Sequence, residues 1–477
     1  MNLMNSLIVA IDNNGGISKK GENTLRWDIK LDTQFFQDVT KRDYNGKKNI
    51  LIMGKNTYES LNLKSSLPGR IIIVVSSTLQ INIPDVYFEP TFNQSYQKAI
   101  DLNEGIIIFC GGKNIYEQAM PLVNIIYLTQ IHDDYQCDNI LDINADHFHV
   151  YSQDTFRLKD TKNDKDVDVT FIKMYLSEPD HFKRIEEHQY LDLLKKILFK
   201  GELRKTRNAL TYSLFSHTME FNLQNSFPLM TTKRMFLKGI FFELMWFISG
   251  STNSKVLEEQ GVNIWKANTS REFLDSMRLN HYDEGDTGPL YGFNFNYYGL
   301  EYKGMNEDYN NKGGINQFEY CLNLLKTDPT SRRIIMSSFN PATANQCVLY
   351  PCHSNILQWY VEDDNKLSLA CYNRSQDVPM ANNWNHVMAA LLVYMFCEIL
   401  TNQGYSYTPS RLIIHMGDVH VYKLHQQETL RQILRDPHPF PTLSFNRKVT
   451  DLNDFKFEDL VLKNYKCYPT IPMKMVA

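Results

Sequence analysis

The stretch from Leu349 to Asn385 constrains the fold most, because two strand-like segments lie in it with only a very short turn between them. The segments run from Asn355 to Glu362 and from Lys366 to Tyr372, and Asp363-Asp364-Asn365 joins them. Strand-like segments with so short a polar connection are expected to pair as a hairpin. Pairing brings the residues before the first segment and those after the second to the same end of the hairpin.

Several reactive side chains are therefore expected at that end. Pro351-Cys352-His353 precedes the first segment, Asn373-Arg374-Ser375-Gln376-Asp377 follows the second, and Asn385 lies shortly after. A cation close to the thiol of Cys352 would favour the thiolate and make the sulfur a nucleophile. A lone cysteine in a strand is usually an ordinary buried residue. Here, however, a thiol, a guanidinium, a hydroxyl, a carboxylate and an amide converge, which favours a reactive site.

Length and composition limit the remaining possibilities. A chain of 477 residues is long enough for two or three domains, and 43% hydrophobic with 22% charged residues is typical of a globular protein. A net charge of -4 argues against nucleic acid as a partner. The longest apolar stretch, Val387 to Cys397, is shorter than the roughly 20 residues of a membrane span. Eight scattered cysteines without C-x-x-C spacing indicate reduced thiols and no metal site. We therefore expect a cytoplasmic protein without a membrane partner.

The N-terminal part alternates short apolar strands with helices. Strands are expected at residues 6–11, 50–53, 71–75, 106–109 and 125–128, and helices near residues 32–40 and 115–120. This alternation predicts an α/β domain with a largely parallel sheet that is covered on both faces. A polar stretch with a proline follows at residues 177–181, and residues 182–200 have the apolar spacing of an amphipathic helix.

The reactive residues of the hairpin resemble those of a known family. Pro351-Cys352-His353, the Arg374-Ser375-x-Asp377 run and Asn385 resemble thymidylate synthase, which methylates dUMP with 5,10-methylenetetrahydrofolate. That resemblance runs from about residue 187 to the C-terminus, and residues 4 to about 176 resemble dihydrofolate reductase. The chain thus resembles the bifunctional dihydrofolate reductase-thymidylate synthases. This implies an α/β reductase domain at residues 1–178, a junction at 179–188, and an α+β synthase domain with a mixed sheet at 189–477.

The synthase resemblance implies three catalytic residues besides a dUMP pocket. Cys352 would attack C6 of dUMP, Glu243 would organise water around uracil and relay protons, and Tyr291 would help to remove the C5 proton. Glu243 lies in the middle of the apolar stretch from Phe236 to Ser249, where an acid must find partners or stay protonated. The implied dUMP contacts are Arg207, Arg332, Arg333, Arg374, Ser375, Asp377, Asn385, His420 and Tyr422, and the implied folate contacts of this domain are Trp265 and Asp377.

Three of these arginines are special cases. Arg207 matches the family's mobile phosphate-binding arginine in a loop that departs from the family pattern, and Arg204 is a rival for that role. Adjacent arginines such as Arg332 and Arg333 are usually a solvated surface pair. In the family they cross the dimer interface to hold the partner's nucleotide phosphate, so the resemblance implies a homodimer.

Asp32 is the key residue of the N-terminal domain. It lies among Trp27, Leu31 and Phe35, and apolar surroundings would raise the pKa of its carboxyl group. The alternative is a first-turn acid that the helix dipole favours. The reductase resemblance implies that Asp32 holds the pterin and promotes protonation at N5, and the implied folate contacts are Ile8, Trp27, Asp32, Phe36, Arg70 and Thr129.

The reductase resemblance also implies a nicotinamide cofactor. Glycine-containing turns let backbone amides approach a pyrophosphate closely. Lys55 and Ser76-Ser77 stand where the family binds the extra ribose phosphate, which indicates NADPH. The implied cofactor contacts are Ala10, Gly54, Lys55, Thr57, Ser76, Ser77, Gly111 and Gly112.

Two other functions remain compatible with the sequence. A pyrimidine nucleotide hydroxymethylase with a linked reductase would let water finish the reaction, and Asn268, in place of an aromatic residue, leaves water access open. Asn385 favours uracil over cytosine in either case, because its amide offers a paired donor and acceptor. In the other alternative, one half of the chain is a non-catalytic dimerisation scaffold, which the altered loop at residues 18–25 makes conceivable.

Overall fold

The computed structural model describes residues 4–22, 24–42, 46–61, 66–177 and 184–476. The chain forms two compact units, which we describe separately. The first contains Met1–Arg184 with Leu434–Asp436, and the second contains Ile185–Ile433 with Pro437–Ala477. The first residues of the predicted junction, 179–183, lie outside the described residues.

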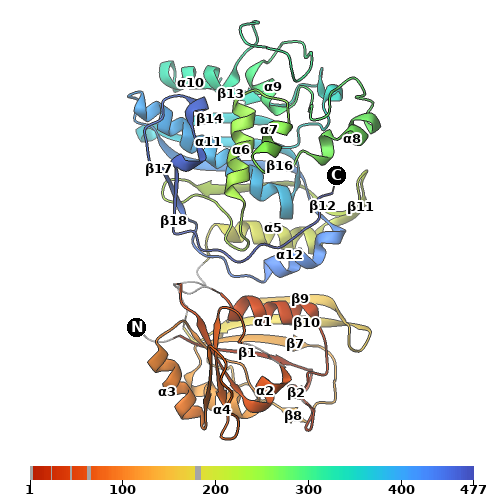
Figure 1. The fold of residues 1–477 in the computed structure, drawn as a ribbon, viewed down its shortest axis with the longest axis vertical. Helices are drawn as coiled ribbons and strands as arrows, with labels where there is room; N and C mark the ends of the chain where they lie inside the picture. Colours follow the sequence, from red (N-terminus) through yellow and green to blue (C-terminus); the bar gives the residue numbers. More distant parts are fainter. Residues whose placement is uncertain (1–3, 23, 43–45, 62–65, 178–183, 477) are drawn as a thin grey trace. The chain divides into compact units, whose positions relative to one another are not determined.

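The main sheet of the first unit is mostly parallel, as the sequence predicts (Figure 1). The inner pairs β1–β6, β1–β7, β3–β6, β3–β4 and β4–β5 are parallel, and β10 pairs antiparallel with β7 and β9. In spatial order the strands are β5 (Val86–Glu89), β4 (Arg70–Val75), β3 (Asn49–Gly54), β6 (Ile107–Phe109), β1 (Asn5–Ile11), β7 (Ile125–Ile131), β10 (Lys165–Tyr175) and β9 (His149–Asp160). A small separate pair is β2 (Gly16–Ser18) with β8 (Asn139–Ile140).

Helices cover both faces of this sheet because its strands are apolar on both sides. Leu7, Val9 and Ile52 point to a core that residues of α3 (Phe92–Leu102) and α4 (Lys113–Ala119) complete. On the opposite face, Phe35 of α1 (Lys30–Thr40) packs edge-on against Tyr127, with ring centroids 6.1 Å apart. The short helix α2 (Lys55–Ser60) directly follows β3.

The second unit contains a mixed sheet, which confirms the α+β class (Figure 1). Only β15 and β16 are parallel neighbours, and the other pairs are antiparallel. The strand order is β11 (Glu202–Lys205), β12 (Leu210–Asn222), β16 (Thr408–Tyr422), β15 (Lys366–Asp377), β14 (Ile356–Glu362) and β13 (Ile335–Ser337). A small pair is formed by β17 (Thr442–Phe445) and β18 (Leu460–Lys463).

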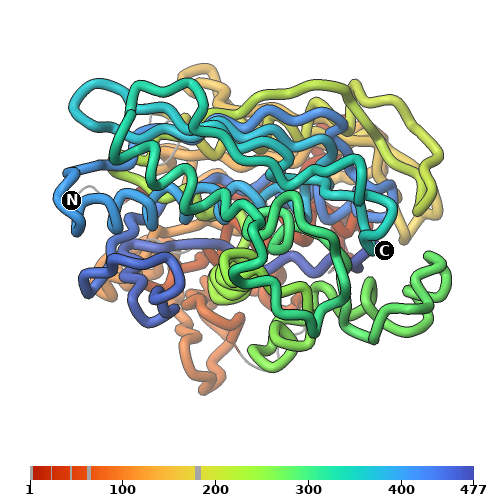
Figure 2. The backbone as a smooth tube through the Cα atoms, turned by 90° about the horizontal axis from the view of Figure 1, so that it is seen from above, coloured from red at the N-terminus to blue at the C-terminus, as the bar shows by residue number. Residues whose placement is uncertain are grey.

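Two apolar helices form the centre of the second unit. Figure 2 looks nearly along α6 (Leu237–Ile248), the green coil, which packs against α11 (Asn383–Asn402). The segment Val378–Asn402 is long and apolar enough to cross a membrane, but 78% of its apolar window is buried inside the structure. That burial is typical of the core helix of a globular protein. The remaining helices of the unit are α5 (Glu187–Lys200), α7 (Lys255–Glu259), α8 (Arg271–Ser276), α9 (Tyr291–Asn296), α10 (Gln317–Thr327) and α12 (Gln426–Ile433).

Helix α5 has the predicted amphipathic face, but it begins later than the sequence suggests. Tyr190 and Ile197 are fully buried, whereas residues 184–186 precede the helix.

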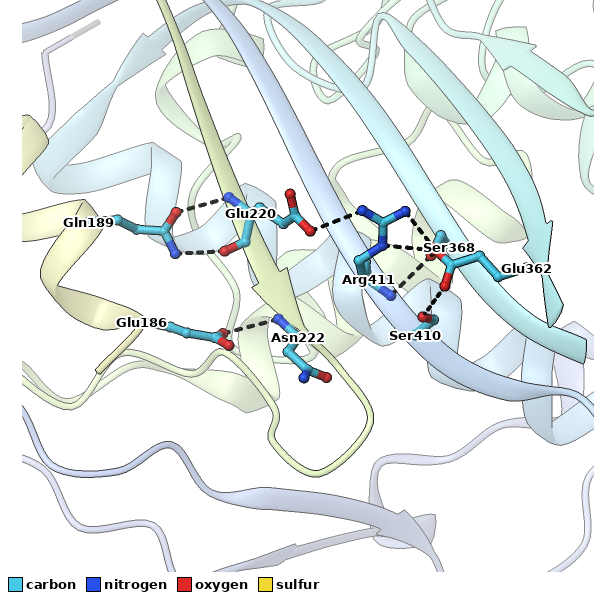
Figure 3. Close-up of polar contacts among 8 residues, drawn as sticks. All are labelled: Glu186, Gln189, Glu220, Asn222, Glu362, Ser368, Ser410 and Arg411. Atoms are coloured by element: carbon cyan, nitrogen blue, oxygen red, sulfur yellow. Dashed lines mark hydrogen bonds and ion pairs between the residues drawn. The ribbon is translucent and has the colours of Figure 1, made fainter. Parts of the chain in front are cut away.

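The side chain of Gln189 bonds both the backbone N–H and the carbonyl oxygen of Glu220 on β12, at 2.9 and 2.7 Å (Figure 3). Arg411 then links the carboxylates of Glu220 and Glu362 across the sheet. β11 pairs only with the first residues of β12. Further along β12, Gln189 of α5 bonds the backbone groups of Glu220 that would otherwise be exposed at the edge of the sheet.

Candidate active sites

The predicted hairpin exists and positions the reactive residues. β14 and β15 are antiparallel, with Ile356 opposite Tyr372, and two left-handed residues form the turn between them. The end of the hairpin continues beyond the strands, because the backbone N–H of Ser375 donates to the carbonyl oxygen of Cys352 at 3.2 Å. Cys352 and Arg374 therefore lie side by side, as the sequence predicts.

The sulfur of Cys352 lies next to a tyrosine hydroxyl and a guanidinium group. The Oη atom of Tyr291 is 3.6 Å from Sγ, and it also accepts the backbone N–H of Cys352 at 2.9 Å. Arg374 is fixed beside them by hydrogen bonds from Nε to the carbonyl oxygen of Pro351 (2.8 Å) and from Nη2 to that of Tyr350 (2.9 Å). These contacts join α9 to the segment before β14, and that segment to Arg374 of β15 at the same end of the hairpin.

The expected preference of Cys352 for the thiolate is wrong for the ligand-free protein. Burial raises the pKa of this thiol, and the hydrogen bond from Tyr291 and the charge of Arg374 lower it by less. The physical reason is desolvation, which penalises the charged form of a buried group. The guanidinium thus acts in the predicted direction, but it does not outweigh burial.

Glu243 has the partners that its position in an apolar helix requires. The indole N–H of Trp265 donates to Oε1 at 2.7 Å, and that of Trp384 donates to Oε2 at 2.5 Å. Burial nevertheless raises the pKa of Glu243 from 4.5 to about 7. Sequence analysis did not identify Trp384, although its place directly before Asn385 was a usable signal.

Two further predicted site residues, Asp377 and His420, belong to the neighbouring parallel strands β15 and β16. The register places Asp377 opposite His420, and Nδ1 of His420 is 2.7 Å from Asp418. Burial raises the pKa of Asp377, while the neighbouring His420, His425 and Lys233 lower it. Lys233, another residue that sequence analysis did not single out, donates to the carbonyl oxygen of Pro379.

Asn385 is held on α11 by a neighbour that sequence analysis did not assign. Its Nδ2 donates to Oε1 of Gln376 at 3.0 Å, and both side chains are buried. This bond fixes the orientation of the Asn385 amide, and the Oδ1 atom takes no part in it. Tyr422, the last residue of β16, packs edge-on against His420.

The arginines that were expected to bind phosphate lie on the surface. Arg207 is exposed and bonds Asn208 at 3.1 Å, and burial raises the pKa of Tyr422 while the charge of Arg207 lowers it by less. Arg204, the rival candidate, is 3.8 Å from Asp418. Arg332 and Arg333 are both exposed just before β13. Among the described residues, none of the four forms a hydrogen bond or ion pair with Cys352, Tyr291 or Arg374.

In the first unit, Asp32 lies in the first turn of α1 as the sequence predicts. Burial raises the pKa of its carboxyl group from 3.8 to about 6, and a hydrogen bond with Thr129 lowers it by less. Thr129 is paired with Ala10 across β1 and β7, which places both on the same strip of the sheet as Ile8. The structure therefore supports the expected raised pKa rather than the alternative of a dipole-stabilised acid.

Two buried donors of the first unit have no hydrogen-bond partner within the described residues. They are Nε1 of Trp27 and Nε of Arg70. Arg70 is 5% exposed, and its Nη1 bonds Thr40 at 2.9 Å. Phe36 is half-buried on the same helix as Asp32. A ligand with carboxylate and ring acceptors would satisfy these donors, so the residues fit a folate.

The expected cofactor residues follow the carboxyl ends of parallel strands, where such sheets bind nucleotides. Gly54 pairs with Val75, so Lys55 and Ser76-Ser77 come next to each other. Lys55 bonds the Thr78 hydroxyl at 3.3 Å in the same turn. The backbone N–H of Gly54 donates to Gly111 at 2.7 Å, and a Cβ on Gly111 would lie 2.7 Å from the ring of Tyr116.

These turns therefore combine glycine backbone, hydroxyl groups and a cation, which fits a phosphorylated dinucleotide. Thr57, on the first turn of α2, and Gly112 face each other, because a Cβ on Gly112 would lie 3.7 Å from Oγ1 of Thr57. Within the described residues, no group of three or more His, Cys, Asp or Glu side chains could hold a metal ion.

Fold and sites define a folate-dependent enzyme with two active sites, one nucleophilic and one of the reductase type. Comparison with known proteins specifies the class. The family model of thymidylate synthase matches residues 188–477, and that of dihydrofolate reductase matches residues 4–174.

Relatives contain both parts in one chain. Proteins named bifunctional dihydrofolate reductase-thymidylate synthase from Paramecium tetraurelia and Zea mays are each 34% identical to this chain. The alignments cover 99% of this chain and 98% and 96% of the two relatives. One from Plasmodium chabaudi is 32% identical over 94% of this chain and 86% of its own length. The chain belongs to the bifunctional dihydrofolate reductase-thymidylate synthase family. These comparisons do not favour a hydroxymethylase or an idle half.

Proposed function

We propose that the residues around Cys352 and Asp32 carry the two activities of the family in separate sites. The second unit reductively methylates dUMP to dTMP, and the first unit reduces the resulting dihydrofolate to tetrahydrofolate. The observation that supports this most strongly is the convergence of Cys352, Tyr291 and Arg374 at one end of the hairpin.

In the second unit, the sulfur of Cys352 would attack C6 of dUMP and make C5 nucleophilic. Because burial raises the pKa of the thiol, its proton must leave as the nucleotide binds. Tyr291 is placed to stabilise the sulfur anion, and Glu243, with a pKa of about 7, is suited to exchange protons near neutral pH. When bound, 5,10-methylenetetrahydrofolate supplies the one-carbon group and the hydride.

The remaining residues of this site would bind and orient the substrates. Arg374, Ser375 and Arg207 would hold the phosphate, and His420 and Tyr422 the ribose. Asn385 would read uracil through its amide, and Asp377 and Trp265 would contact the folate. Gln376 supports the uracil assignment because it fixes the amide of Asn385.

In the first unit, Asp32 would hold the pterin and promote protonation at N5. A pKa of about 6 keeps part of this carboxyl group protonated near neutral pH. Trp27, Ile8, Phe36 and Thr129 would line the pterin pocket, and Arg70 would hold the folate glutamate. NADPH supplies a hydride when it is bound, and Ala10 with the residues of the two glycine turns and of Ser76-Ser77 would hold it.

A matched pair of variants tests the assignment of two separate sites. Cys352→Ala should abolish dTMP formation and leave dihydrofolate reduction unchanged, because it removes only the nucleophile. Asp32→Asn should do the reverse. Both activities are measured on both full-length variants, and loss of both activities in either variant would contradict separate sites.

We also infer a homodimer formed through the outer face of the second unit's sheet. Large apolar side chains are exposed on this face, and the residues that alternate with them along the strands are buried on the other face. The exposed ones are Ile335, Ile356, Tyr360 and Tyr372, which are 41%, 42%, 64% and 41% exposed. A second copy is the partner that such a face fits, since obligate dimer interfaces are apolar. Arg332 and Arg333 next to β13 would then reach the partner's nucleotide phosphate.

Mixing two inactive variants tests this dimer. Cys352→Ala and Arg333→Ala chains, unfolded and refolded together, should regain about a quarter of wild-type dTMP formation, because half of the dimers contain one intact site out of two. The separate variants, treated alike, are the controls. No recovery would contradict a site shared between subunits.

The remaining assignments rest on sequence and have direct tests. Domain boundaries at 1–178 and 189–477, with a junction at 179–188, predict that limited proteolysis cuts first between the two family-matched parts. A cytoplasmic location, without a membrane or nucleic-acid partner, predicts recovery in the soluble fraction of cells. Recovery with membranes would contradict it.

A further inference from the structure

Trp384 contacts the buried carboxylate of Glu243 from the wall of the nucleotide site. Its indole N–H donates to Oε2 at 2.5 Å, while Trp265 donates to Oε1 at 2.7 Å. Each oxygen of this carboxylate therefore has one partner that can only donate. Trp384 is half-buried and directly precedes Asn385 on α11.

The structure makes room for this indole on α6. A Cβ on Gly239, one turn before Glu243, would lie 2.7 Å from Cη2 of Trp384. The ring of Phe236 packs against the same indole, with centroids 6.4 Å apart. The indole is thus held in place from two sides, which keeps its N–H directed at the carboxylate.

We propose that Trp384 is a positioning residue that stabilises the ionised form of Glu243 and holds its carboxylate in one orientation for its proton transfers. The proposal rests on the role proposed above for Glu243. With both oxygens bonded to rigid rings, the carboxylate cannot rotate about its last torsion, and its remaining lone pairs keep fixed directions. A hydrogen bond to a charged group also stabilises the charge.

The surroundings of Glu243 leave these two indoles as its main polar partners. Burial raises its pKa to about 7, and both indole donors act in the opposite direction. The facing titratable groups are the Cys352 thiol, whose pKa Glu243 raises, and the Tyr291 hydroxyl beside it. Burial lowers the pKa values of His353 and His386 to about 3 and 4, so both are neutral at pH 7.

Other ionisable side chains lie on elements that pack against α6, but among the described residues none donates a hydrogen bond to Glu243. They are Lys255, Glu258 and Glu259 of α7, Glu398 of α11, and Asp454, Glu458 and Asp459 of the two short turns at residues 452–454 and 457–459. Asp459 is paired with Arg447 at 2.6 Å.

Trp384→Phe is the direct test, because it removes the N–H and keeps an aromatic ring. The acid limb of the pH profile of kcat for dTMP formation should move to higher pH by about one unit, since the lost bond favoured the ionised acid. The KM for methylenetetrahydrofolate should stay within about twofold. Trp359→Phe is the matched control, because the buried Trp359 indole N–H has no hydrogen-bond partner among the described residues and the pH profile should not change.

The possible results separate the alternatives. A higher KM with an unchanged pH profile would mean that Trp384 only lines the folate pocket, and it would overturn the proposal. If Trp384→Phe does not fold, Gly239→Ala displaces the same indole and should move the acid limb in the same direction. Glu243→Gln tests the underlying role. Full activity of that variant would refute the relay itself, whereas its loss together with an unchanged Trp384→Phe profile would refute only the role of Trp384.

Discussion

Replacing Asp32 with asparagine is expected to stabilise the first unit at pH 8 while it abolishes dihydrofolate reduction. Burial raises the pKa of Asp32 from 3.8 to about 6, so the folded state favours the neutral acid. As the pH rises from about 4 through 6, the unfolded chain releases this proton before the folded chain does. The free energy of unfolding therefore falls over this interval in the wild type.

The size of the effect follows from the two pKa values. A difference of roughly two units corresponds to about 3 kcal/mol, which is an upper limit because Asp32 is partly exposed. Asparagine has nearly the shape of the neutral acid and does not titrate, so the variant avoids this loss. Both proteins should be similarly stable at pH 4. At pH 8 the variant should unfold about 5 to 10 °C higher for a unit of this size.

Differential scanning calorimetry from pH 4 to pH 8 measures this difference. The transition of the first unit is the one that added NADPH shifts upward in the wild type. Asp101→Asn, which changes an exposed carboxylate at the end of α3, is the matched control and should leave the transition unchanged. Equal transition temperatures for wild type and Asp32→Asn at both pH 4 and pH 8 would refute a burial penalty at this site.

Three further predictions concern two other site residues and one backbone turn of the second unit. Alkylation of Cys352 in the ligand-free protein should be slow at pH 7 and accelerate with pH, and Arg374→Gln should slow it by a further factor of about ten, as peptide mass mapping measures. Gly288→Ala should destabilise the second unit by about 2 to 4 kcal/mol in calorimetry, because the added Cβ would lie 2.2 Å from a backbone carbonyl at a φ of +72°. Gly299→Ala, with φ +92° and open space, should cost only about 1 kcal/mol. Arg70→Leu should raise the KM for dihydrofolate by about 100-fold with little change in kcat, and a pure kcat loss would contradict its role in binding.

Local patterns were sufficient where the physics is local. The two segments around the turn at residues 363–365 predicted the hairpin, and alternating apolar strands predicted the parallel sheet of the first unit. The raised pKa of Asp32 followed from its apolar sequence neighbours in one helical turn. In each case the deciding residues are close together in the chain.

Predictions failed where a balance of long-range effects decides. The charge of Arg374 was visible in the sequence, but the burial of Cys352 that outweighs it depends on how α9 closes over the hairpin. The later start of α5 at Glu187 was missed as well, because residues 184–186 read Arg-Ile-Glu, which a helix tolerates, yet they precede the helix.

The sequence by itself determined which chemical groups this protein has and which of them share a strand, a turn or a helix, because backbone geometry fixes those neighbours. For Cys352 and Glu243, only the tertiary structure decided the protonation and orientation of the side chain. Trp384 and Trp265 are far apart in the chain, yet together they hold the carboxylate of Glu243. Burial and hydrogen-bond partners from distant segments set the energy of the charge on Cys352 and Glu243, and adjacent residues do not reveal those partners.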